Sequence, residues 1–139
     1  MDHTSGHISI RHQVSLQATD TIHSKLSYKS EAFASGVTVQ AYHSDKGTFA
    51  AKDFVHAIDE AHQTIQFSGS HTGFQNGVAE QAIQTIVNMA RTMMLHAALQ
   101  TPEKEINPDL WPMAMDYAVF IYNRIPNQST GYSPIKLWT

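Results

Sequence analysis

The sequence contains no cysteine and no apolar run long enough to cross a bilayer. Without thiols the chain can form neither a disulfide nor a zinc site with thiolate ligands, which suits an intracellular protein. No charged segment followed by an apolar one opens the chain, so we expect no secretory leader. The length of 139 residues and a hydrophobic content of 42% predict one domain, residues 1–139, with a single core.

Positive charge is also scarce in this sequence. There are 9 lysines and arginines and 12 aspartates and glutamates, which gives a net charge of -3. Contacts with phosphates supply most of the non-specific affinity of a nucleic-acid-binding protein. If a nucleic acid is the substrate, we therefore expect partner domains or sister subunits to supply most of the affinity.

The spacing of apolar residues predicts strands and helices that alternate along the chain. Alternation of apolar and polar residues predicts strands over 7–14, 37–43 and 64–67. Helical spacing predicts helices over 20–34, which Gly36 ends, over 50–62, over about 75–99 and over about 108–124, with an extended tail over 125–139. The buried stripe expected on the long helix consists of Ala79, Ala82, Ile83, Ile86, Ala90, Met93, Met94 and Ala97.

Two acidic residues lie where an α/β fold places ligand sites. Asp45 follows the second predicted strand, and Glu80 lies near the start of the long predicted helix. Ligands bind at the C-terminal edge of such strands, and Mg²⁺ prefers carboxylate oxygens. Solvated acids are common on protein surfaces, so these two acids alone are a weak signal for a metal site. The residues that flank them make the signal stronger.

Those flanking residues form several motifs in a fixed order. They are Ser44-Asp45-Lys46-Gly47 with Phe49, the stretch from Gln75 to Glu80, Met89-Ala90-Arg91-Thr92-Met93, Leu110-Trp111-Pro112, Asn123-Arg124-Ile125-Pro126, and Gly131-Tyr132-Ser133-Pro134 with Trp138. In this order they resemble the integrase catalytic core of copia-type retrotransposons. That group belongs to the RNase H-like family of retroviral integrases and DDE transposases. The resemblance runs from about Asp2 to Trp138.

The resemblance implies an α/β fold with an RNase H-like mixed sheet flanked by helices. It implies that an intact relative carries out polynucleotidyl transfer with Mg²⁺ or Mn²⁺, in 3′-end processing and strand transfer during DNA integration. Asp45 and Glu80 would be catalytic acids and metal ligands. The residues expected to contact DNA are His71, Asn76, Gln84 and Lys46. The implied partners are element and target DNA, sister copies and other polyprotein domains, in the nucleus or cytoplasm and without a membrane.

The resembled family uses three acids, and the first has no clear match here. The segment from Asp2 to His7 resembles the second strand of the family, so we expect the chain to be N-terminally truncated. It would then lack the first strand and the first metal ligand, and be inactive alone. Asp2 is the only nearby substitute, and its place in the motif disfavours it. Loss of a central strand would also leave sheet edges unpaired and the fragment marginally stable.

Two other departures from the family pattern concern DNA and metal. After Glu80 the family usually has basic residues, whereas this chain has Gln81, Ala82 and Gln84. Lys46 replaces an asparagine, and it could pair with Asp45 or contact a DNA phosphate. Apart from His3 and His7, which lie outside every predicted helix, no two of the nine histidines have the His-x-x-x-His spacing, so we interpret all but His71 as scattered surface and core residues.

Two alternative functions remain open. The chain could be a catalytically inactive remnant or a co-opted nucleic-acid-binding module, which the departures above favour. A less favoured alternative is an RNase H-like nuclease that cuts DNA without joining it.

Overall fold

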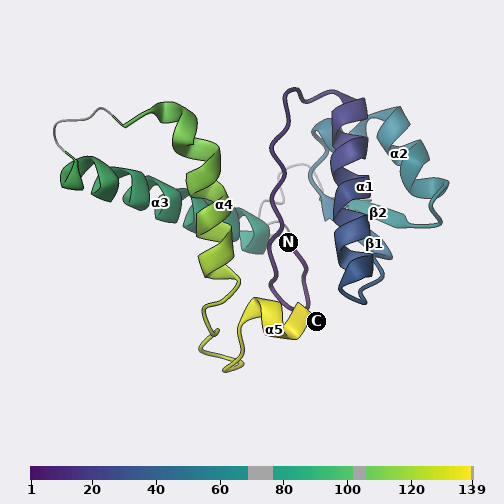
Figure 1. Ribbon diagram of the computed structural model, residues 1–139. Helices are drawn as coiled ribbons and strands as arrows, with labels where there is room; N and C mark the ends of the chain where they lie inside the picture. The colour runs from purple at the N-terminus through teal and green to yellow at the C-terminus, as the bar shows by residue number, and fades with distance from the viewer. Residues whose placement is uncertain (69–76, 102–105, 139) are drawn as a thin grey trace. The chain divides into compact units, whose positions relative to one another are not determined.

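The computed structural model describes residues 1–68, 77–101 and 106–138 (Figure 1). The chain divides into two compact units, and each has its own internal contacts. The first unit consists of residues 1–10 and 79–138, and the second consists of residues 11–78. Within the described residues, we find no helix that is both long and apolar enough to cross a membrane.

The second unit contains a sheet of two parallel strands, β1 (Ala41–Ser44) and β2 (Thr64–Phe67). Ala41 lies opposite Thr64, and Ser44 lies opposite Phe67. Parallel strands need a crossover connection, which here contains the 3-10 helix η1 (Thr48–Ala50) and the helix α2 (Lys52–Asp59). Because the strands run in the same direction, both end at the same edge of the sheet.

Helix α1 (Ala18–Ala34) belongs to the second unit, and a buried lysine connects it to the rest of that unit. Lys25 Nζ donates a hydrogen bond to Ala57 O at 2.7 Å and lies 5.9 Å from the centre of the Tyr42 ring. Burial lowers the pKa of Lys25 and raises the pKa of Tyr42, because it disfavours the charged form of each. The apolar core of the unit consists of Ala32, Phe54 and Ile58.

A glycine ends α1, as predicted. Gly36 has a φ of +78°, a left-handed conformation that residues with a Cβ rarely adopt. The Gly36 N–H donates to Phe33 O at 3.0 Å, and the Val37 N–H donates to Ala32 O at 2.8 Å. These two bonds satisfy carbonyl groups at the helix end.

The first unit is built on two helices, α3 (Gly77–Gln100) and α4 (Trp111–Tyr122). The 3-10 helix η3 (Pro108–Leu110) leads into α4, and Asn107 caps it by accepting a hydrogen bond from Asp109 N at 2.9 Å. The buried core cluster consists of Ile86 and Ala90 from α3 with Ala118 and Val119 from α4.

The N-terminal segment of the first unit packs against α4 and a short final helix, α5 (Pro134–Trp138). The backbone of Ile8 is hydrogen-bonded to the side chain of Asn123. The His7 ring stacks on Trp138 with ring centroids 4.7 Å apart. Ile135 N donates to Asn123 O at 2.9 Å, so Asn123 connects the end of α4 to both chain segments.

The prediction of a strand over residues 7–14 is wrong. Residues 7–14 form no strand, and β1 begins only at Ala41 instead of at residue 37. A strand needs the backbone of a neighbouring strand, which alternation of side chains does not supply. The backbone of Ile8 instead bonds to the side chain of Asn123.

Other predicted bounds can be compared with the structure directly. The strand over 64–67 is confirmed as β2. The long helix expected over about 75–99 corresponds to α3, and the last helix expected over about 108–124 to η3 and α4. The tail expected to be extended over 125–139 contains α5, so it is not extended throughout. Ile83 and Ala97, which we expected to be buried, are exposed on α3.

Candidate functional site

Asp45 lies at the C-terminal edge of the parallel sheet. It directly follows β1, and its side chain is exposed to solvent. A turn through Gly47 leads away from it, and a Cβ added to Gly47 would lie 3.5 Å from Asp45 Oδ1. The turn therefore passes close to the carboxylate. This placement is the one the sequence predicted for Asp45.

A cross-strand hydrogen bond joins the ends of the two strands beside Asp45. His43 Nε2 lies 3.0 Å from Ser68 Oγ, and Ser68 N donates to Ser44 O at 2.9 Å. His43 is exposed, whereas Ser68 is buried. We interpreted His43 as one of the scattered histidines, and its contact with Ser68 was missed. The sequence offers no signal for that contact, because it depends on the register of β1 and β2.

Glu80 lies in the first turn of α3 with its side chain exposed. Gln84 follows one turn later and is also exposed, and its Nε2 donates to Asn88 Oδ1 at 3.2 Å. Residues four apart share a face of a helix, so these three side chains form a polar row on α3. The buried residues of α3 occupy the other side and are Ala82, Ile86 and Ala90.

The two acids lie in different units, Asp45 in the second and Glu80 in the first. Their sharing of one metal ion stays a prediction. Within the described ranges, no three His, Asp or Glu side chains gather into a metal-binding cluster. Two further predicted DNA contacts, His71 and Asn76, lie outside the described residues.

The chemistry of these two acids fits a hard divalent ion. Both carboxylates are exposed, and across the described part of the chain neither forms an ion pair with a lysine, arginine or histidine. Lys46, which could have paired with Asp45, is exposed and makes no such pair there. Unpaired carboxylate oxygens are the ligands that Mg²⁺ and Mn²⁺ prefer.

Asp2 is engaged in a turn of its own. Its Oδ2 accepts hydrogen bonds from Ser5 N at 2.6 Å and from Ser5 Oγ at 2.7 Å. Partial burial alone would raise the pKa of Asp2, but the hydrogen bonds from Ser5 outweigh it and hold this pKa below its ordinary value. Asp2 therefore stabilises the N-terminal turn, and the expectation that it is not a metal ligand stays a prediction.

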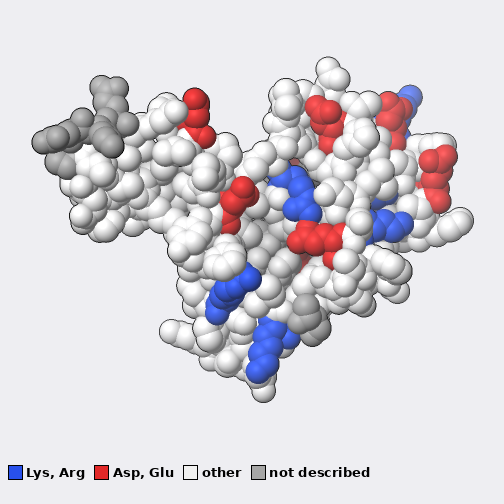
Figure 2. Space-filling view, viewed as in Figure 1, with Lys and Arg blue, Asp and Glu red and all other residues white. Residues whose placement is uncertain are grey.

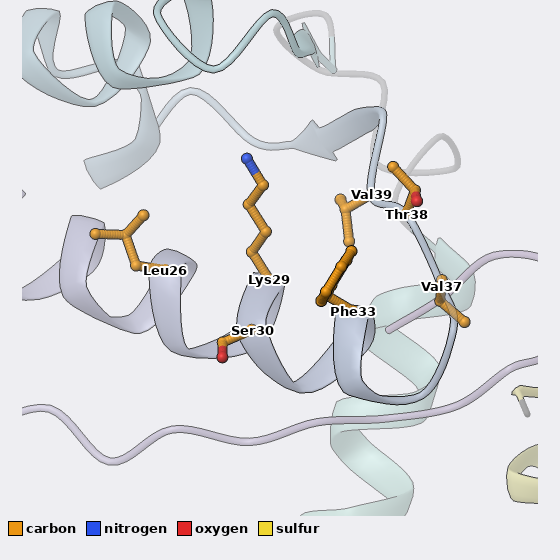
Figure 3. Close-up of a pocket in the computed structure, with 7 residues that line it drawn as sticks. All are labelled: Leu26, Lys29, Ser30, Phe33, Val37, Thr38 and Val39. Carbon is orange, nitrogen blue, oxygen red and sulfur yellow. The ribbon is translucent and has the colours of Figure 1, made fainter.

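A pocket of about 290 Å³ lies between α1 and the segment that follows it (Figure 3). Its lining is mostly apolar and comes from α1 and the segment that follows it. None of the predicted site residues lines this pocket. Its residues are Leu26, Lys29, Ser30, Phe33, Val37, Thr38 and Val39.

Comparison with solved structures shows that the chain has the α/β fold of integrase catalytic cores. The α/β class predicted from the sequence is thereby confirmed. The described residues contribute a small parallel sheet with helices to this fold. No known family model and no curated protein sequence matches the chain.

Three structures illustrate this similarity. The catalytic core domain of HTLV-2 integrase, solved with magnesium in a trimeric form, aligns with a TM-score of 0.72 at 17% identity, over 99% of this chain and 80% of that one. A simian T-cell lymphotropic virus intasome in complex with PP2A regulatory subunit B56 gamma aligns with a TM-score of 0.77 at 16% identity, over 99% and 45%. The catalytic core domain of BIV integrase aligns with a TM-score of 0.66 at 19% identity, over 96% and 78%.

Proposed function

We propose that this chain is the scaffold of a copia-type retrotransposon integrase core, and that Asp45 and Glu80 are two of its catalytic acids. The observation that carries the proposal is the position of Asp45. Among the residues that the structure describes, it is an exposed carboxylate without an ion-pair partner at the C-terminal edge of a parallel sheet, in a chain with the integrase-core fold. The motif from Gln75 to Glu80, which enters α3, supports the second acid.

Asp45 and Glu80 would hold Mg²⁺ or Mn²⁺. The HTLV-2 integrase core to which this fold is similar was solved with magnesium. When bound, the ion would neutralise negative charge on a phosphodiester undergoing cleavage or transfer. The protein's own contribution is to keep both carboxylates exposed and, among the described residues, free of ion pairs with cations.

We propose DNA as the partner, with Gln84 and Lys46 among the contacts. Both side chains are exposed, Gln84 one turn after Glu80 and Lys46 directly after Asp45. His71 and Asn76 complete the predicted set. Because the chain has a net charge of -3, self-association or other polyprotein domains would supply the rest of the affinity. A DNA substrate implies a nuclear or cytoplasmic location.

We do not propose Asp2 as a third acid, and its hydrogen bonds from Ser5 N and Oγ to Oδ2 support that choice. We therefore expect the 139-residue chain to lack strand-transfer activity by itself. In keeping with that, the residues after Glu80 supply no cation, since Gln81, Ala82 and Gln84 stand there. These observations favour the second candidate function, an inactive remnant or a co-opted nucleic-acid-binding module.

Affinity for a labelled branched DNA separates the two candidates. If Asp45 holds a metal that contacts DNA, affinity should fall in EDTA and with Asp45→Asn, and Asp59→Asn should leave it unchanged. Asp59 is a suitable control because it is an exposed aspartate in the same unit. Affinity that survives both EDTA and Asp45→Asn would support the binding module instead. DNA cleavage without joined products would indicate the nuclease alternative.

A further inference from the structure

The C-terminal part of the first unit is basic and aromatic, although the whole chain is acidic. Residues 117–139 contain Arg124 and Lys136 and no aspartate or glutamate. In the lowest part of Figure 2, where α4 ends and α5 lies, the charged side chains on the visible face are basic. This region therefore has a charge opposite to that of the chain, which makes it suited to an anionic partner.

Tyr117 and Phe120 of α4, with Arg124 two residues after the end of the helix, form an exposed platform. The rings of Tyr117 and Phe120 lie at an interplanar angle of 10° with centroids 6.1 Å apart. The Arg124 guanidinium carbon lies 3.5 Å from the centre of the Phe120 ring, and Arg124 Nη1 donates to Phe120 O at 3.1 Å. Tyr117 is 57% exposed and Phe120 is 49% exposed. The aromatic rings are therefore held in place by neighbours and still face solvent.

A second pair of the same kind lies on the tail. Lys136 Nζ lies 4.7 Å from the centre of the Tyr132 ring, and Tyr132 is 49% exposed. Ile135, which directly precedes Lys136, donates a backbone hydrogen bond to the carbonyl of Asn123. Asn123 in turn directly precedes Arg124. The two cations therefore belong to one end of the first unit.

Exposed rings combined with cations are the chemistry that binds unpaired nucleotides. Bases stack on aromatic rings and on guanidinium planes, while the cations contact the phosphates. A duplex hides its base faces and offers only phosphates to such a surface. Asp116, the nearest acid in the sequence, lies four residues before Phe120 and therefore on the same side of α4, one turn from that ring. The two cations, Arg124 and Lys136, outnumber this one acid.

We propose that Tyr117, Phe120 and Arg124, together with Tyr132 and Lys136, form a binding site for single-stranded DNA. This site rests on the proposed function and adds to it the form of DNA that is bound away from Asp45 and Glu80, namely single-stranded DNA. It does not use Asp45 or Glu80. Binding at this site is therefore independent of divalent ions.

The test is fluorescence anisotropy of a labelled oligothymidine in EDTA, with a duplex of equal length as competitor. Tyr117→Leu should weaken binding by about fivefold or more with an unchanged salt dependence, since it removes a stacking partner. Arg124→Gln and Lys136→Gln should each reduce the steepness of log K against log salt by about 0.7, the value for one phosphate contact on a single strand. Lys52→Gln, which removes an exposed lysine of the second unit, should change neither quantity.

The proposal is overturned if wild-type protein shows no measurable binding at low salt, or if the duplex competes as well as the single strand. It is also overturned if Lys52→Gln has the same effect as Arg124→Gln, which would indicate general electrostatics only. Thermal melts of the variants identify any loss of folding, and the two charge variants test the site if Tyr117→Leu does not fold. A failure of Asp45 to bind metal would contradict the proposed function and leave this result intact.

Discussion

The side chain of Asn123 holds the backbone of Ile8 with both ends of its carboxamide. Ile8 N donates to Asn123 Oδ1 at 2.9 Å, and Asn123 Nδ2 donates to Ile8 O at 2.8 Å. The two residues are 115 positions apart, and Asn123 is buried. The asparagine side chain thus forms the hydrogen bonds to the backbone N–H and C=O that a neighbouring strand would otherwise form.

Replacing this asparagine should destabilise the first unit strongly. Asn123→Ala leaves the N–H and C=O of Ile8 without partners in a partly buried site, which costs about 2 to 4 kcal/mol. Urea unfolding followed by circular dichroism measures the loss. Asn88→Ala, which changes an exposed asparagine on α3, should alter stability by less than about 0.5 kcal/mol. Equal effects of the two substitutions would contradict the role assigned to Asn123.

The turn formed by Asp2 and Ser5 should make the N-terminal segment sensitive to acid. Because the pKa of Asp2 is lower in the folded protein than the ordinary 3.8, its contribution is present above that pH. The contribution is lost as the pH falls through the folded pKa. Asp2→Asn should cost roughly 1 kcal/mol at neutral pH, and this difference should shrink towards zero in acid. A difference that stays constant down to low pH would refute this assignment.

The hydrogen bond between His43 and Ser68 should couple the two strand ends. We expect His43→Ala and Ser68→Ala to show a coupling of about 1 kcal/mol in a double-mutant cycle at fixed neutral pH. The bond joins β1 and β2 directly, so the coupling should appear in the free energy of unfolding even without metal. Additive effects of the two substitutions would mean that the contact contributes nothing to the sheet.

The outer edge of β1 should promote self-association. In the part of the chain that the structure describes, β1 pairs only with β2, so one edge has unpaired backbone groups. Ala41→Lys places a charge on an exposed residue of that edge and should lower the aggregated fraction at high concentration. Ala34→Lys, an equal change of charge on the exposed end of α1, is the control for net charge. Light scattering that falls equally for both variants would attribute the effect to charge alone.

Local patterns explain which parts of this fold the sequence predicts. The end of α1 follows from a left-handed glycine, and β2 follows from its β-branched and aromatic residues. Both signals depend only on a few neighbouring residues. The segment over 7–14 has the alternation of a strand, but pairing is a long-range property that its own residues do not determine. Its backbone contacts Asn123, a residue near the other end of the sequence.

The same distinction applies to the candidate site. Asp45 and Glu80 were found from motifs, and the structure gives each the expected local setting, after a strand and in the first turn of a helix. The contact between His43 and Ser68 was missed because it arises from strand register. The platform on α4 was also missed. Its residues have helical spacing, which predicts the helix but does not indicate that Tyr117 and Phe120 are exposed.

A titration with Mn²⁺ followed by NMR can show whether Asp45 and Glu80 bind the same ion, because a bound paramagnetic ion broadens nearby amide signals. We predict that the amides around Asp45 and Glu80 broaden at the same low Mn²⁺ concentration. Asp45→Asn should abolish this broadening, and Asp59→Asn should preserve it. Broadening confined to other residues, or unchanged by Asp45→Asn, would contradict the claim that Asp45 and Glu80 hold the catalytic ion.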